Sequence, residues 1–220
     1  MSSLYASPVA DVLDRLFAES EVVDPPLSDE IRVEVDRRGG VIVETDLAGI
    51  LDKMYISVDR LGGRFLYGLA RSQGSKTIVE YGTSFGISTI HLAAAVRDNG
   101  GGIVVTTELN PEKADRARKN LADAGLLEYV DIRLGDARET LKDLDGPVDL
   151  LFLDGWKDLY LPILRMLEPR LRVGSIVVGD DLDILEETLR PYLDYVRDPR
   201  HGYTSVDIPL GDRLEFSVRT

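Results

Sequence analysis

The chain has 220 residues, of which 44% are apolar, and it carries a formal net charge of -13. This length suits one domain with a sizeable core, and the acidic balance disfavours nucleic acid and anionic membranes as partners, because both require clustered Lys and Arg. The absence of cysteine and the presence of only two histidines exclude disulfides and thiolate zinc sites, so any metal must be held mainly by oxygen atoms. We find neither a signal peptide nor an apolar stretch of membrane-spanning length, and we therefore expect a cytoplasmic protein without membrane contact.

Residues 1–52 differ in pattern from the rest of the chain. We predict a short helix from Val9 to Ala18, a break at the "DPP" of residues 24–26, and a hairpin within residues 31–45, whose alternation surrounds two glycines. We interpret this segment as a flap over the core, with a substrate cap or a dimer arm as the alternative. Residues 53–220 then form the main domain.

From about residue 60, short apolar runs alternate with amphipathic segments, which is typical of a parallel sheet covered by helices on both faces. The predicted strands are residues 77–82, 102–108, 129–135, 148–154 and 174–180. Residues 203–220 alternate on either side of a turn at Gly211 and Asp212, which indicates an antiparallel hairpin joined to that sheet. The fold class is therefore α/β and doubly wound.

Three helices have recognisable signals. Asn110 caps the first, Pro111 lies in its first turn, and Gly125 ends it. The second helix covers residues 158–171, between the fourth and fifth strands. The third covers residues 182–198, where we expect Pro191 to kink or split it.

Acidic residues stand at the ends of five consecutive predicted strands: Glu80, Glu108, Asp136, Asp154, and the pair Asp180 and Asp181. Ligands of doubly wound sheets bind beyond these carboxyl ends. The first strand opens into "EYGTSFGIST", where Gly82 and Gly86 let the backbone approach a ligand closely. This is neither the dinucleotide motif nor a P-loop, and a plain tight turn is the alternative.

Glu108 follows Gly82 by 26 residues (108 minus 82), a spacing that suits an acid accepting hydrogen bonds from ribose hydroxyls. Asp136 would then lie beside an adenine and accept from its amine; capping the next helix is the alternative, and the two roles are compatible. Trp156 could form a wall of the adenine site or pack in the core. A nicotinamide cofactor makes the same demand on Glu108, so an oxidoreductase remains an alternative.

Asp154, Asp180 and Asp181 follow neighbouring strands and should converge. Carboxylates so close repel one another unless a cation lies between them, and Mg²⁺ held by oxygen ligands fits best, although the last two could instead cap a helix. Lys157 can reach the same point, where a cation would lower its pKa and favour the neutral amine of a general base. An ordinary solvated lysine is the alternative.

The two histidines carry less information. His91 lies in the helix expected after the glycine turn, and we interpret it as a packing residue. His201 lies in the loop before the final hairpin, and its role is left open.

Five segments together resemble the successive motifs of class I S-adenosylmethionine-dependent O-methyltransferases, in the metal-dependent, catechol O-methyltransferase-like family. They are "VEYGTSFGISTIHLA", "TTELNPEKADRARKN", "GDA", "FLDGWKDLYLP" and "GSIVVGDD". The resemblance runs from about Lys53 to Thr220, and "FLDGWKDLYLP" is its most specific part. It implies one Rossmann-like domain with a seven-stranded sheet and a C-terminal antiparallel hairpin.

The resemblance also implies roles for individual residues. The S-adenosylmethionine (SAM) site would comprise Val58, Glu80, Gly82, Ser84, Ser88, Glu108, Asp136, Ala137, Asp154 and Trp156. Within it, Glu108 would bind the ribose, and Asp136, Ala137 and Trp156 would surround the adenine. Asp154, Asp180 and Asp181 would bind Mg²⁺, or another dication such as Mn²⁺ or Ca²⁺. Lys157 and Asp154 would be the catalytic residues.

Three positions depart from the family pattern. Asp181 stands where the family usually has asparagine, and an added charge there should tighten cation binding or change the preferred ion. Arg213 stands where many bacterial relatives have glycine. Val206 stands where catechol enzymes have the glutamate that accepts a hydrogen bond from the second hydroxyl, so a requirement for a vicinal diol does not follow.

The sequence therefore predicts metal-dependent methyl transfer from SAM to a hydroxyl of a small phenolic or catechol-like acceptor. The resemblance is compatible with a homodimer. The alternatives are methylation of a tRNA uridine hydroxyl, which some family members perform, the nicotinamide oxidoreductase, and a non-catalytic nucleoside sensor.

Overall fold

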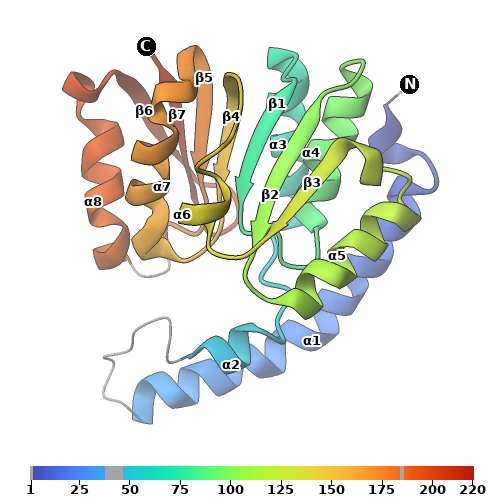
Figure 1. Ribbon diagram of the computed structural model, residues 1–220. Helices are drawn as coiled ribbons and strands as arrows, with labels where there is room; N and C mark the ends of the chain where they lie inside the picture. Colours follow the sequence, from blue (N-terminus) through green and yellow to red (C-terminus); the bar gives the residue numbers. More distant parts are fainter. Residues whose placement is uncertain (1, 38–46, 184–185) are drawn as a thin grey trace.

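The computed structural model describes residues 2–37, 47–183 and 186–220, and its centre is a seven-stranded sheet in the order β3-β2-β1-β4-β5-β7-β6 (Figure 1). The strands are β1 Thr77–Tyr81, β2 Ile103–Glu108, β3 Val130–Leu134, β4 Val148–Leu153, β5 Leu171–Gly179, β6 Tyr203–Ile208 and β7 Leu214–Arg219. The first five are parallel, whereas β7 is antiparallel to both β5 and β6. The predicted fold class and the C-terminal hairpin are confirmed.

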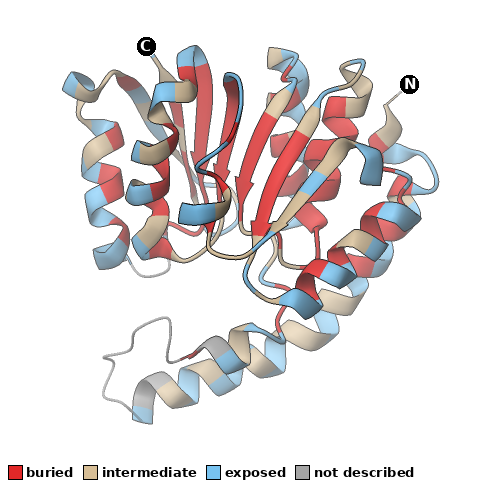
Figure 2. Cartoon of the chain, in the orientation of Figure 1, coloured by how far each residue is buried: buried red, intermediate tan, exposed pale blue. Residues whose placement is uncertain are grey.

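Both faces of the sheet are covered, which explains why its central strands are buried along most of their length (Figure 2). Side chains alternate between the faces along each strand. Ile78 and Leu150 join the core formed with α1, α3, α4 and α5, whereas Val79 and Leu151 join the core formed with α7 and α8.

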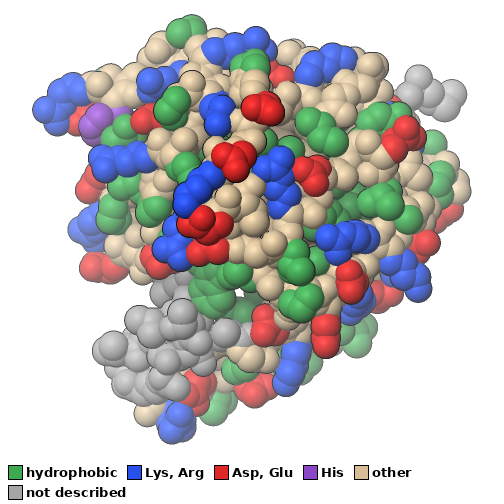
Figure 3. Space-filling model, viewed as in Figure 1, with side chains coloured by type: hydrophobic (Ala, Val, Ile, Leu, Met, Phe, Trp, Pro, Cys, Tyr) green, Lys and Arg blue, Asp and Glu red, His purple; other side chains and the backbone are tan. Residues whose placement is uncertain are grey.

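The helices on the first face are α1 Val9–Arg37, α3 Arg60–Gln73, α4 Ile87–Asp98 and α5 Pro111–Asp123, and those on the second face are α6 Ala137–Thr140, α7 Tyr160–Leu167 and α8 Glu186–Arg197. Helix α2, Ala48–Leu51, follows α1 (Figure 1). Short 3₁₀ turns occupy Ser3–Tyr5, Leu127–Tyr129, Lys157–Leu159, Glu168–Arg170 and Pro199–His201. Within the described residues, no helix combines the length and the apolar character needed to span a membrane. Figure 3 shows basic and acidic side chains interspersed on one face of the molecule.

Most of the predicted helices agree with the structure. Asn110 caps α5 by accepting hydrogen bonds from the backbone N–H groups of Glu112 and Lys113. Helix α8 continues through Pro191, so the expected split is wrong within the described part of that segment. Helix α3 was not predicted; its N-cap is Asp59, whose side chain accepts from the Gly62 N–H at 2.6 Å.

The prediction for the N-terminal segment is wrong in its first half. Helix α1 continues from Val9 to Arg37 through Pro25 and Pro26, so residues 31–37 are helical and not the first strand of a hairpin. The remainder of the expected hairpin lies outside the described residues. The apolar side chains of the first three turns of α1, among them Leu16 and Phe17, are buried in the same core as α4. Packing against the domain thus holds this helix.

Candidate functional site

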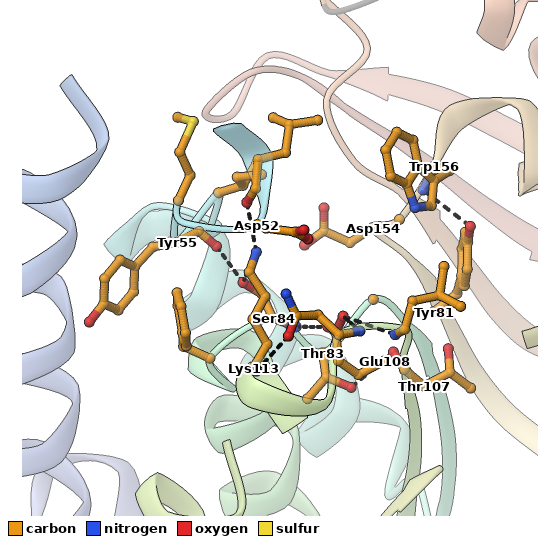
Figure 4. A pocket seen from close by; sticks show the side chains of 18 of the residues that line it. Asp52, Tyr55, Tyr81, Thr83, Ser84, Thr107, Glu108, Lys113, Asp154 and Trp156 are labelled. Carbon is orange, nitrogen blue, oxygen red and sulfur yellow. Dashed lines mark hydrogen bonds between the residues drawn. The ribbon is translucent and has the colours of Figure 1, made fainter. Parts of the chain in front are cut away.

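A cavity of about 1090 Å³ lies at the carboxyl ends of β1, β2 and β4, where the strand order reverses (Figure 4). Its floor comprises the turn after β1, the end of β2 with the start of α5, residues 135–138, residues 154–157 and Leu159. Its other wall comprises Ser28 and Ile31 of α1 together with residues 47, 49 and 51–57. We call residues 47–57 the roof segment. The N-terminal part of the chain therefore lines the cavity.

The turn after β1 is built around Gly82, which has φ +105°. A Cβ atom at this position would overlap the carbonyl group of Asp154, whose own N–H donates to the Tyr81 carbonyl at 2.8 Å. Glycine is therefore required for the chain after β4 to pass this close. Gly82, Ser84 and Ser88 all line the cavity, as expected.

The Glu108 carboxylate is oriented by backbone donors. Its Oε2 accepts from the N–H of Ser84 at 2.8 Å, and its Oε1 accepts from those of Leu109 and Asn110, each at 2.9 Å. Both oxygens keep lone-pair capacity for hydroxyl donors. Glu108 lines the cavity, which is the position expected of a ribose ligand.

Asp136 and Ala137 line the same cavity beyond Glu108. Asp136 caps α6 by accepting from the Arg138 N–H at 2.9 Å, so the capping interpretation is confirmed. Its carboxylate also pairs with the Arg138 side chain, and this pair lowers the pKa of Asp136. An adenine amine would share this carboxylate with Arg138.

Two of the expected cofactor residues do not line this cavity. Glu80 is buried inside β1, where its Oε2 accepts from the hydroxyls of Thr89 at 2.5 Å and Thr106 at 2.7 Å. Burial raises the pKa of Glu80 to about 7, and its Oε1 has no hydrogen-bond partner within the described part of the chain. Val58 borders a smaller neighbouring cavity of about 510 Å³. Their assignment to the cofactor site stays a prediction.

The acidic residues after β4 and β5 gather around Lys157. Its Nζ lies 2.7 Å from Asp181 Oδ2 and donates to the Tyr160 hydroxyl at 2.8 Å. The Asp181 N–H donates to Asp180 Oδ1 at 2.9 Å. Asp154, Lys157 and Asp181 line the cavity, whereas Asp180 is buried behind them.

The electrostatics of this acidic cluster determine the charge of Lys157 beside the three carboxylates. Burial and the mutual repulsion of the carboxylates raise the pKa values of Asp154 and Asp180. Burial alone would lower the pKa of Lys157, but Asp181 and Asp154 outweigh it and raise that pKa. Lys157 is therefore an ammonium paired with Asp181, and the neutral amine expected beside a bound cation stays a prediction.

The acidic cluster of Asp154, Asp180 and Asp181 has the charge and the oxygen donors that suit a dication, but its side chains are not arranged around a common point. Three carboxylates face one ammonium, and the remaining negative charge and hard oxygen atoms suit Mg²⁺. However, no group of three acidic or histidine side chains in the described ranges is arranged to hold a metal ion. The ion pair of Asp181 with Lys157 engages one of the three expected ligands.

Trp156 and the two histidines have clear positions. Trp156 lines the cavity, and its backbone N–H donates to the Tyr81 hydroxyl at 3.1 Å. His91 is a packing residue, as expected: its Nδ1 lies 2.8 Å from the Ile87 carbonyl oxygen, and burial lowers its pKa to about 4. His201 stacks on Tyr195, with ring centroids 3.9 Å apart, and does not line the cavity.

Sequence reasoning missed Tyr81, Lys113 and the roof segment. Tyr81 directly precedes Gly82, and Lys113 lies in the helix that Asn110 caps, but an aromatic strand residue and a helical lysine are common and do not by themselves indicate a site. The roof segment is held by Asp24 of α1, whose carboxylate accepts from the N–H groups of Tyr55 at 2.8 Å and Ile56 at 3.1 Å. A contact between such distant residues leaves no local pattern in the sequence.

Known proteins are similar to this chain in sequence and in structure. Residues 79–182 match a family model described as a methyltransferase domain. The catechol O-methyltransferase of Niastella koreensis is 34% identical over 166 residues, covering 74% of this chain and 73% of that enzyme. The catechol O-methyltransferase of Mycobacterium tuberculosis is 36% identical over 58% of this chain and 57% of its own length. The solved structure of the O-methyltransferase TomG from Streptomyces achromogenes, in complex with SAM, matches with a TM-score of 0.70 and 25% identity, over 79% of this chain and 86% of that chain.

Proposed function

The chain belongs to the SAM-dependent O-methyltransferases of the catechol O-methyltransferase-like family, and we propose that it methylates a hydroxyl of a small phenolic or catechol-like acceptor with the help of a divalent cation. Membership of this family gives the reaction class and the methyl donor, and it overturns the nicotinamide oxidoreductase alternative. The proposal concerns the acceptor, the cation and the residues that act.

The observation that carries the proposal is that Glu108, Asp154 and Lys157 all line one cavity. A nucleoside held by Glu108 and Asp136 at one end would place the sulfonium toward Gly82. The acceptor hydroxyl would then lie between the sulfonium and the acidic cluster. Such alignment of reacting atoms is the main contribution a protein can make to a displacement of this kind.

The proposed reaction is an in-line displacement. The methyl carbon bonds to the acceptor oxygen as its bond to sulfur breaks, and the sulfur keeps the electron pair and loses its positive charge. The hydroxyl proton passes to Nζ of Lys157. Because Nζ can accept a proton only as a neutral amine, the Lys157 ammonium must first release one proton to solvent, and its ion pair with Asp181 opens as this charge is lost.

Asp154, Asp180 and Asp181 are the residues that would hold the cation. A bound dication lowers the pKa of a hydroxyl next to it. The raised pKa values of Asp154 and Asp180 support this assignment, since they reflect the burial of carboxylates that also repel one another. Asp181 supplies a carboxylate where an amide is usual in the family, so we expect tighter cation binding than an asparagine would give.

The cavity wall favours an aromatic acceptor over a nucleic acid. Trp156, Leu159 and Met54 present apolar surface to the cavity, which suits a phenolic ring. Val206 is 52% exposed on β6 and does not line the cavity, so no side chain at this position accepts from a second hydroxyl. A tRNA acceptor is less well supported, because of the net charge of -13 and the interspersed charges in Figure 3.

The test is a methylation assay with labelled SAM and a panel of phenols, catechols and flavonoids. We expect methylation in Mg²⁺, loss in EDTA, and recovery when Mg²⁺ is restored. Asp154→Ala should abolish turnover yet bind S-adenosylhomocysteine (SAH) within about threefold of the wild type. Asp158→Ala, which removes an exposed acid four residues away, is the matched control. Full activity of Asp154→Ala in EDTA would reject the scheme.

A further inference from the structure

Lys113 is a buried basic residue that the proposed reaction leaves without a role. It lies in the first turn of α5, lines the cavity, and is only 7% exposed. Its Nζ donates to the Leu51 carbonyl at 2.9 Å and to Ser84 Oγ at 3.3 Å, and lies 5.2 Å from the centroid of the Phe85 ring. Burying an ammonium is costly, so a structural or binding reason is required.

The two acceptors of Lys113 belong to opposite walls of the cavity. Leu51 ends α2 in the roof segment. Ser84, which Figure 4 labels, lies in the turn after β1. Ser84 Oγ also donates to the carbonyl of the roof residue Tyr55 at 2.7 Å. Lys113 and Ser84 together therefore connect the roof segment to the floor.

Lys113 also adjoins the expected ribose ligand. The N–H of Ser84 donates to Glu108 Oε2, so Lys113 and Glu108 hold the same residue from two sides. Ser84 has φ +47°, an uncommon conformation for a residue other than glycine, and these contacts offset its strain. A lysine ammonium has three donors, and the structure gives Nζ two acceptors within the described residues.

We propose that Lys113 is a positioning residue of the cofactor site: its third N–H donates to a ribose hydroxyl oxygen of SAM, while the other two fasten the roof segment over the bound nucleoside. This inference rests on the proposed placement of the ribose at Glu108. If Lys113 contacts both the ribose and the roof segment, binding of the nucleoside should also stabilise the roof segment. Since Met54 and Ile56 of that segment also line the cavity, the cofactor would shape the acceptor side of the site.

The first experiment is calorimetry of SAH binding to the full chain. Lys113→Met should weaken binding at least about tenfold, since it removes hydrogen bonds made by a charged donor. Lys113→Arg should recover part of that loss. Lys119→Met is the matched control, because Lys119 lies on the same helix but is exposed and does not line the cavity, and it should bind as the wild type does. Wild-type affinity in Lys113→Met would overturn the proposal.

A second measurement separates this role from a purely structural one. SAH analogues that lack a ribose hydroxyl should bind the wild type more weakly, and for one of them Lys113→Met should cause no further loss. Equal losses from Lys113→Met with SAH and with every such analogue would overturn the ribose contact. If Lys113→Met does not fold, hydrogen exchange on the wild type decides: amides of residues 51–57 must slow when SAH binds, and unchanged exchange would overturn the coupling.

The variant Glu108→Gln separates a failure of the proposed ribose placement from a failure of the proposed role of Lys113. If this variant binds SAH weakly while Lys113→Met binds normally, the placement of the ribose stands and the role of Lys113 fails. If neither variant changes the affinity, the placement of the ribose itself is wrong.

Discussion

Gly82 determines how closely the turn after β1 can approach the chain after β4. Its conformation is left-handed, and the space that a side chain would occupy is filled by the Asp154 backbone. The sequence alone showed that a glycine stands here, but a glycine turn has many uses. Only the contact with the Asp154 backbone shows that Gly82 brings the turn after β1 against the segment that carries the acidic cluster.

Gly82→Ala should therefore cost more stability than its backbone conformation alone explains. Gly101 provides the control, since its φ of +98° is close to the +105° of Gly82 but nothing lies within 4 Å of its missing Cβ. We expect Gly101→Ala to cost about 1–2 kcal/mol and Gly82→Ala about 1–3 kcal/mol more, from the added overlap. Urea unfolding of both variants measures this, and equal costs would show that the contact with Asp154 is unimportant.

His91 makes stability depend on pH. Its folded-state pKa of about 4 lies below the ordinary value of 6.5, so the unfolded chain takes up a proton that the folded chain does not. Stability from this group is complete above pH 6.5 and falls by up to about 3 kcal/mol as the pH decreases to about 4. Glu80 acts in the opposite direction, since its pKa is raised to about 7.

The measurement is the free energy of unfolding between pH 4 and pH 7.5 for the wild type and His91→Gln. The difference between the two curves should change across this window, because the substitution removes only the contribution of His91. Parallel curves for the wild type and His91→Gln would contradict the assignment.

At the scale of elements, the sequence predicted the parallel strands well because burial on both faces leaves a continuous apolar run. It could not predict which way an acid at a strand end would point. Glu80 precedes the last residue of β1, so its side chain stands across the sheet toward Thr89 of α4, whereas Asp154 follows β4 and reaches the cavity. The pairing of Lys157 with Asp181, 24 residues apart, likewise depends on the fold.

Helix α1 shows that helix-breaking residues are also an unreliable guide when only the sequence is read. Pro25 and Pro26 predict a stop, since each removes a helical N–H donor. The helix continues because tertiary contacts stabilise it on the N-terminal side of the prolines. Its first turns are buried in the core, and the Asp24 side chain accepts hydrogen bonds from the roof segment. Local propensity gives way to tertiary contacts here.

Asp24→Ala should loosen the roof segment, because it leaves the N–H groups of Tyr55 and Ile56 without their acceptor. We expect a loss of about 1–3 kcal/mol in stability and a higher KM for the acceptor, since Ile56 lines the cavity. Asp29→Ala, on the same helix, removes only an exposed pair with Arg32 and should change neither quantity. Urea unfolding and steady-state kinetics test this; equal effects of the two variants would contradict it.

At the scale of the whole molecule, the boundary predicted near residue 52 does not separate two cores. Leu16 of α1 is fully buried in the cluster that includes α4 and β1, so the N-terminal helix belongs to the core of the domain. The sequence suggested a flap because the alternation after residue 30 resembled strands. The roof segment and α1 together give the N-terminal part both a structural place and a position beside the cavity.

Leu16→Ala should accordingly cost about 2–5 kcal/mol, as for a core leucine. Val22→Ala is the control, because Val22 lies on the same helix and is 73% exposed; its cost should stay within about 0.5 kcal/mol. Thermal and chemical unfolding measure both. A small effect of Leu16→Ala would indicate that α1 is attached loosely and that the domain folds without it.

The position of β7 between β5 and β6 has a consequence for biosynthesis. Strand β6 is synthesised before β7 but pairs only with β7, so it cannot join the sheet until β7 has been made. The nascent chain therefore passes through a stage in which the edge of β5 is unpaired. Such an edge can pair with foreign strands. The backbone contact of Leu182 with Arg213 forms only after this stage, so the segment that carries Asp180 and Asp181 matures late, and ribosome-bound intermediates should lack a finished acidic cluster.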